Sequence, residues 1–339
     1  MIQEIRIKNY LSFRDEVVLS FEATKDTTFE ECQVVNVTPK VRLLRFALIY
    51  GANASGKSNL LKAMDFLRDS WFDKKSDIDE DTGVVPFLLD TETPNEPSEF
   101  NIKFFVGDKR YWYALVLDDK QVIKEDLYVY NSVQPSLVFS RELDGTASLI
   151  KLNASLVKAN ATIVEQLNVK CLSNMSFFAA RNQVNCSLAY IDEVRDWMKN
   201  NMMPIIEPGT RMFEYAGKQM EKNAELKAYI LDFVHKADYN ITDVYTEREK
   251  VPIPDFVKTS IMEDKDIPEK TKERMLADNA LERLRTDFQH TVKNKRGEES
   301  YRLPNSLQSE GTKRTFGIEA AIYEAIKTNG ILPIDEIES

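Results

Sequence analysis

The sequence predicts an α/β fold with an antiparallel β subdomain and a helical insertion. Three observations predict it. Residues 46–50 form an apolar run, followed at once by a glycine-rich segment and an amphipathic stretch. Residues 99–140 hold four segments of β-branched and aromatic residues, and residues 150–236 show mainly helical periodicity. The first pattern is typical of a buried parallel strand leading into a helix, so we expect it at the core.

The N-terminal lobe is expected over residues 1–150. Residues 1–8 alternate apolar and polar side chains, as in a half-buried strand, and residues 16–21 repeat the pattern. The parallel strand and its helix are expected at about 44–73. Further strands are predicted, with turn signals between them, at 99–106, 110–118, 122–130 and 136–140.

A mainly helical insertion is expected over residues 151–286. Ile191, Val194, Trp197 and Met198 follow the spacing of one helix face, and residues 221–235 repeat such a stripe. A strand is predicted at 241–247. Residues 255–285 are charged, helix-prone and broken by Pro268. They fit either a solvated helical insertion or an arm that contacts a partner or DNA. A C-terminal lobe is expected over residues 287–339.

The composition excludes several classes of protein. Lys and Arg number 45 against 55 Asp and Glu, a formal net charge of −10, so the chain is no general polyanion binder. Only two histidines and three cysteines occur, which disfavours a zinc site or a histidine-dependent triad. An odd cysteine number suits a reducing cytoplasm. No apolar run approaches the ~18 residues of a membrane span, so we expect no membrane contact.

The glycine-rich segment has the spacing G-x-x-x-x-G-K-[ST], which is typical of a phosphate-binding loop. Its glycines let the backbone close around an anion, and the following helix directs N–H groups at the phosphates. We expect Lys57 to reach the β- and γ-phosphates and the Ser58 hydroxyl to bind Mg²⁺. The expected nucleotide contacts are Gly51, Asn53, Ala54, Ser55, Gly56, Lys57, Ser58 and Asn59.

Residues 331–336 are a short apolar run that ends in Asp335 and Glu336. This is the form of a Walker B strand, in which Asp335 would support Mg²⁺ and Glu336 would orient or deprotonate the attacking water. A surface strand end has the same appearance. The phosphate-binding loop in the same chain favours the catalytic interpretation.

A helix is predicted from about residue 310 to 327, with Ile318, Ala321, Ile322, Ala325 and Ile326 on one face. Ser309 would be its N-cap. The same geometry also allows Ser309, Gly311 and the helix N-terminus to bind a phosphate.

Lys293, Lys295 and Arg296 are the best candidates for a local nucleic-acid contact, although an exposed hairpin turn at Arg296 and Gly297 explains them as well. The segment 294–297 reads Asn-Lys-Arg-Gly and lacks the aspartate of a guanine-reading N-K-x-D motif, so a GTPase is disfavoured. An intrinsic nuclease is also disfavoured, because no compact acidic metal cluster is visible beyond residues 335–336.

Taken together, these motifs resemble the ABC-type AAA ATPases grouped with SMC, RecF and overcoming-lysogenization-defect proteins. The chain looks most like bacterial stand-alone ATP-binding proteins of phage-defence and restriction-associated loci. The matching segments are residues 5–13, 51–61, 309–314 and 334–338, while the middle of the chain matches only loosely.

The resemblance implies a head domain that binds ATP and Mg²⁺ and a homodimer, or higher oligomer, with ATP sandwiched between two heads. It implies that Ser309 and Gly311 contact the γ-phosphate held by another copy, and that Glu336 is the catalytic base. Two parts of the family pattern are not found: a Q-loop glutamine, and the D-loop and switch histidine expected after residue 336. His290 precedes the signature segment and is expected to be a structural residue on a strand.

Two hypotheses of function follow. In the first, hydrolysis reopens the ATP-closed dimer and the motion controls an effector, expected to be a nuclease, in anti-phage defence. In the second, the chain is a non-hydrolysing scaffold or sensor that sequesters a toxic partner. An SMC- or RecF-like role in DNA repair is a further alternative.

Overall fold

The computed structural model of the chain describes residues 1–237, 239–264, 268–276 and 280–337. These residues form two compact units. The first unit comprises Met1–Glu207 and Thr328–Ile337, and the second comprises Pro208–Lys327. The predicted lobe boundaries at residues 150 and 286 divide the chain differently and stay predictions.

The first unit is built on a seven-stranded sheet with the order β2-β1-β5-β6-β7-β8-β9. Every neighbouring pair in it is antiparallel. The antiparallel β subdomain is therefore present, and the two N-terminal strands belong to the same sheet. The strands are β1 (Ile2–Lys8), β2 (Val17–Ser20), β5 (Ser98–Val106), β6 (Lys109–Leu117), β7 (Val122–Tyr130), β8 (Ser136–Asp144) and β9 (Ala147–Leu152).

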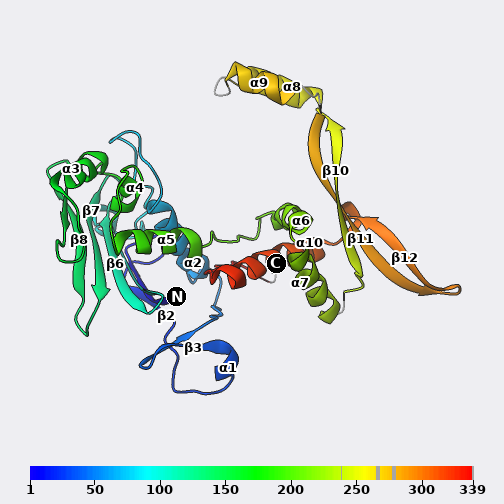
Figure 1. Cartoon of the computed structure of the whole chain (residues 1–339), viewed down its shortest axis with the longest axis horizontal. Coiled ribbons are helices and arrows are strands. Elements are labelled where there is room, and N and C mark those ends of the chain that lie inside the picture. The colour runs from blue at the N-terminus through cyan, green and yellow to red at the C-terminus, as the bar shows by residue number, and fades with distance from the viewer. Residues whose placement is uncertain (238, 265–267, 277–279, 338–339) are drawn as a thin grey trace. The chain divides into compact units, whose positions relative to one another are not determined.

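Short helices accompany this sheet (Figure 1). Helix α5 (Ile191–Asn201) buries Ile191, Val194, Trp197 and Met198, so the predicted stripe is confirmed. The other elements of the first unit are α1 (Glu30–Gln33), β3 (Val34–Thr38), β4 (Val41–Leu44), α2 (Lys57–Ser70), the 3₁₀ turn η1 (Thr93–Asn95), α3 (Ala161–Lys170) and α4 (Phe177–Arg181).

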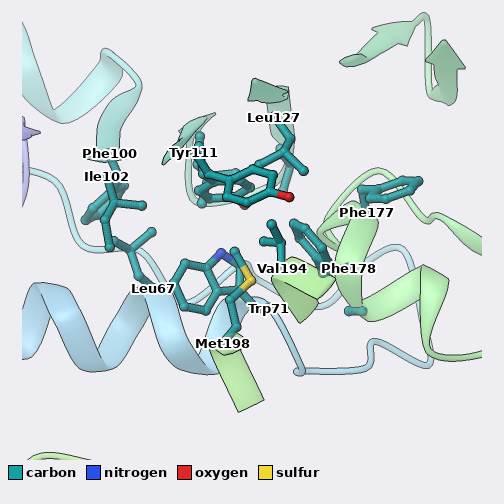
Figure 2. Close-up of a cluster of buried hydrophobic side chains, with 14 of the residues drawn as sticks. Leu67, Trp71, Phe100, Ile102, Tyr111, Leu127, Phe177, Phe178, Val194 and Met198 are labelled. Carbon is teal, nitrogen blue, oxygen red and sulfur yellow. The ribbon is translucent and has the colours of Figure 1, made fainter. Parts of the chain in front are cut away.

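Helix α2 is held by the core of the first unit. Its apolar face, Leu60, Ala63, Met64 and Leu67, is buried, and Trp71 directly after it is fully enclosed. Figure 2 shows Leu67 and Trp71 among side chains from the sheet and from helices α4 and α5. Each large apolar side chain buried in this way contributes about 1.5–3 kcal/mol. The helix that starts at the phosphate-binding loop is therefore fixed in place.

The predicted buried strand at residues 46–50 is wrong. These residues form no regular strand, and Phe46, Leu48 and Tyr50 are 63%, 66% and 87% exposed. Strand β4 ends at Leu44, and the large sheet places β1 directly beside β5. An apolar run becomes a buried strand only where neighbouring strands pair with it, and no described strand pairs with this one.

The second unit is a three-stranded antiparallel sheet with helices (Figure 1). Phe288 of the sheet packs against Phe316 at 5.0 Å between ring centroids. The predicted helical run through residue 285 is wrong from Ala280 on, where β11 begins. Residues 265–267 and 277–279 of that run lie outside the described residues. The elements are α6 (Met212–Lys222), α7 (Ala224–Lys236), β10 (Asp243–Pro252), α8 (Asp255–Glu263), α9 (Glu269–Leu276), β11 (Ala280–Asn294), β12 (Gly297–Pro304), the 3₁₀ turn η2 (Asn305–Leu307) and α10 (Glu310–Thr328).

Helices α6 and α10 approach each other closely at Gly317. A Cβ atom at this position would lie 2.9 Å from the backbone carbonyl carbon of Met212, which begins α6. No larger residue fits without moving one helix away from the other. The two helices are in backbone contact at this point.

No helix within the described ranges is both long and apolar enough to cross a membrane.

A buried carboxyl group, Glu125, joins the sheet to helix α4. Its two oxygens accept hydrogen bonds from the Tyr113 hydroxyl at 3.0 Å and from the Phe177 N–H at 2.6 Å. Arg141 lies opposite on β8, and Asp126 is the next residue on β7. Burial raises the pKa of Glu125 to about 7, against the opposing effects of the Phe177 N–H, the Arg141 charge and the Tyr113 hydroxyl.

This shift makes the stability of the first unit depend on pH. The folded-state pKa is above the ordinary glutamate value of 4.5, so the folded chain holds an extra proton between these two pH values. The contribution of Glu125 to the free energy of unfolding is fully present below pH 4.5, and it is lost as the pH rises through about 7. We expect Glu125→Gln to remove this pH dependence. From acidic to mildly alkaline pH, the free energy of unfolding of the variant should therefore rise by about 3 kcal/mol relative to that of wild type.

Urea unfolding followed by tryptophan fluorescence would measure this change. Trp71, Trp112 and Trp197 all lie in the first unit, so the signal reports on that unit. Glu142→Gln is the matched control, because Glu142 lies on the neighbouring strand with its side chain 49% exposed. Parallel stability profiles for wild type and Glu125→Gln would contradict the prediction.

Candidate nucleotide-binding site

The phosphate-binding loop has a tight backbone that depends on Gly56. Ala54 and Gly56 have φ angles of 61° and 93°, both in the left-handed region. A Cβ on Gly56 would lie 2.7 Å from a ring carbon of Phe13 and 3.0 Å from the Ser12 Oγ. Glycine is thus required at position 56 by both its backbone angle and the lack of space.

Lys57 folds back over the loop. Its Nζ donates hydrogen bonds to the carbonyl oxygens of Gly51 and Ala52, at 3.0 and 2.9 Å. The ammonium group is thus held at the backbone of residues 51 and 52, where it would meet an anion bound by the loop. The positive charge and the loop N–H groups then act on the same phosphates.

Helix α2 begins at Lys57 with no side chain capping its first N–H groups. Uncapped N–H groups at a helix start, together with the helix dipole, form an anion-binding end. Ser58 lies in this first turn and is partly buried, whereas Asn53, Ala54 and Ser55 are exposed on the loop. The predicted phosphate-binding residues thus include the uncapped first turn of α2, and their role in binding a phosphate stays a prediction.

The connection between β1 and β2 supports the loop, a role that the sequence reasoning did not assign. Asn59 donates its side-chain N–H to the Ser12 Oγ at 2.9 Å, and Phe13 packs against Gly56. Asn9 fixes this connection by donating to the carbonyls of Thr93 and Glu96, both at 2.8 Å. The only available signal was the Asn9–Phe13 segment itself, which carries no standard motif spacing.

The acidic pair Asp335 and Glu336 lies in the same unit as the loop. Residues 331–335 pair in parallel with residues 202–206 through two isolated bridges, Met202 with Ile331 and Ile206 with Ile334. The expected strand is therefore reduced to two bridges. Asp335 is half-buried, and Glu336 is exposed with a φ of 48°. Such a strained angle in a non-glycine residue is enriched at active sites.

Ser309 and Gly311 lie in the second unit at the start of α10. The Ser309 Oγ accepts the Thr312 N–H at 3.0 Å and lies 2.8 Å from the Thr312 hydroxyl. Ser309 is thus the N-cap that the sequence predicts. The role of Ser309 and Gly311 in binding a phosphate of another copy stays a prediction.

The candidate basic patch is a hairpin turn. Asn294 pairs with Gly297, whose φ is 112°, and Lys293 forms an ion pair with Glu298 at 3.2 Å. This local pairing offsets part of the positive charge, so the geometry gives no separate support for nucleic-acid binding. His290 lies on β11 with its Nε2 2.8 Å from the Gln308 side chain, as expected for a structural residue.

The described part of the chain holds no group of three or more His, Cys, Asp or Glu side chains that could bind a metal on its own. Mg²⁺ beside a nucleotide needs no such group, because phosphate oxygens, water and one or two protein oxygens complete its shell. The Ser58 hydroxyl, in the first turn of α2, and the Asp335 carboxylate are chemically suited to that role.

Comparison with known proteins matches part of the first unit. Residues 46–151 match the family model described as an AAA domain, putative AbiEii toxin, type IV toxin–antitoxin system. The match begins at the exposed run before the phosphate-binding loop and ends within β9. No curated protein matches the chain. The match and the loop geometry together support a P-loop ATPase of the AAA/ABC type.

Proposed function

We propose that this chain binds and hydrolyses ATP with Mg²⁺ and closes as a head-to-head homodimer on the nucleotide. The observation that carries the proposal is the loop itself. Lys57 is bonded to the loop carbonyls, Gly56 is in the left-handed region, and the first turn of α2 has no side-chain cap. Glu336 acts as the base for the attacking water, and Asp335 supports the metal.

In this proposal the second half of each ATP site comes from another copy. Ser309 and Gly311 start α10, a helix of 19 residues, so its dipole favours a phosphate at that end. The dimer controls an effector, a nuclease, in bacterial anti-phage defence. Support for that context is the sequence resemblance and the toxin–antitoxin wording of the matched family. A cytoplasmic location fits the three free cysteines.

Mixing two inactive variants tests the shared site. Lys57→Ala removes the loop lysine, and Ser309→Arg blocks the predicted trans contact. Each variant alone is expected to be inactive. In a 1:1 mixture, half of the dimers are mixed and each restores one of two sites, so about a quarter of the wild-type ATPase rate should return.

Three results would separate the parts of the proposal. A mixture that stays inactive beside an active wild type would contradict the shared site. Light scattering that shows no association with ATP would contradict the dimer. A wild-type chain that binds ATP and associates without hydrolysis would favour the scaffold or sensor role.

A further inference from the structure

Asp65 reaches from helix α2 to a distant backbone segment. Its Oδ1 accepts the N–H of Ile205 at 3.2 Å, across 140 residues of sequence. Asp65 also lies 3.7 Å from Arg68 on the same helix, with its side chain 27% exposed. This carboxylate therefore links the phosphate-binding helix to the segment 202–206.

The short parallel pairing of residues 202–206 with residues 331–335 does not use the N–H of Ile205. Met203 donates to the Ile331 carbonyl and Ile206 donates to the Pro333 carbonyl, both at 3.0 Å. Pro204 between these two donors has no N–H, and the Ile205 N–H donates to Asp65 instead of to residues 331–335.

The next contact reaches the acidic pair. The Asp335 N–H donates to the Ile206 carbonyl at 2.9 Å. One residue, Ile206, thus separates the Asp65 contact from the backbone of Asp335. At the other end, α2 begins at Lys57, about 12 Å from Asp65 along a buried, rigid helix. A continuous set of contacts therefore runs from the phosphate-binding loop to the segment that carries Asp335.

We propose that Asp65 is a positioning residue that sets the place of Asp335 and Glu336 relative to the phosphate-binding loop. The inference rests on the proposed function, since it assigns Asp335 to the metal and Glu336 to the water. Asp65 acts through its hydrogen bond to Ile205 and needs no contact with the nucleotide. A displacement of about 1 Å at such a site costs up to ~100-fold in rate.

Three variants test the role of this hydrogen bond. Asp65→Ala removes the acceptor and is expected to lower kcat about tenfold, to leave KM for ATP within about twofold, and to raise the Mg²⁺ concentration for half-maximal rate. Asp65→Asn keeps an oxygen that accepts the same N–H and should restore the wild-type rate. Asp69→Ala is the matched control, because Asp69 lies one turn further on and pairs with Arg68 at 2.6 Å.

Two results would overturn the proposal: an Asp65→Ala variant with wild-type kcat and Mg²⁺ dependence, or an Asp65→Asn variant as impaired as Asp65→Ala. If Asp65→Ala does not fold, Asp65→Glu replaces it. That variant keeps the charge, moves the acceptor by one methylene and is expected to lower kcat several-fold, and an unchanged kcat would count against the role.

Amide hydrogen exchange tests the link without any activity. In Asp65→Ala or Asp65→Glu the amides of Met203, Ile205, Ile206 and Asp335 are expected to exchange at least about tenfold faster, while Asp65→Asn keeps their protection. Unchanged exchange would overturn the inference even if the wild type hydrolyses ATP. Faster exchange in a chain that does not hydrolyse ATP would instead keep the positioning role and contradict the proposed reaction.

Discussion

Lys57→Ala is expected to abolish ATP binding and hydrolysis. The ammonium group is bonded to the carbonyls of Gly51 and Ala52 in the loop, and it would donate to the β- and γ-phosphates. Each hydrogen bond to a charged group is worth about 1.5–3 kcal/mol, so losing two of them weakens binding by at least ~100-fold. Calorimetric titration with ATP would measure the loss.

The matched control for this prediction is Lys62→Ala. Lys62 is exposed on the same helix and lies outside the loop, so its loss should leave ATP affinity within about twofold. Neither variant should alter the melting temperature by more than a few degrees, because the Lys57 bonds are exposed. A Lys57→Ala chain that binds ATP as tightly as wild type would show that the loop is not the nucleotide site.

Glu336→Gln is expected to stop turnover while ATP still binds. A general base contributes about 10²–10⁴-fold to rate, and glutamine keeps the shape of the side chain but cannot accept the proton. We expect kcat to fall by at least ~100-fold. The closed dimer should then persist on ATP, which size-exclusion chromatography with light scattering would detect.

Glu31→Gln provides the comparison, because Glu31 is an exposed glutamate of the first unit on α1, outside the site residues. Its ATPase rate and oligomeric state should match those of wild type. If Glu336→Gln neither slows turnover nor stabilises a dimer, another group activates the water. Glu336 would then be an exposed residue of a turn with no catalytic role.

Local patterns predicted much of the fold. The strands predicted at 99–106, 110–118 and 122–130 and the stripe of α5 were correct, because these patterns reflect local structure. The phosphate-binding loop is a prediction of the same local kind, because its glycines and lysine lie within eight residues.

Predictions that depend on distant partners were less successful. The run at 46–50 is apolar enough for a core strand, yet Tyr50 is 87% exposed because no described strand pairs with it. In α10 the predicted face extended to Ile326, which is 62% exposed, while Phe316 and Tyr323 are buried. The contact from Asp65 to Ile205 spans 140 residues and has no local signal at all.

The absence of a side chain at Gly317 has a mechanical consequence for the N-terminal end of α10, where Ser309 lies. Because the backbone of Met212 occupies the space of a Cβ, α10 cannot turn about its own axis or slide past α6 without a steric clash. Helices α6 and α10 are therefore expected to move together as one rigid body. Any movement that carries Ser309 toward or away from a nucleotide has to carry α6 and the start of the second unit with it.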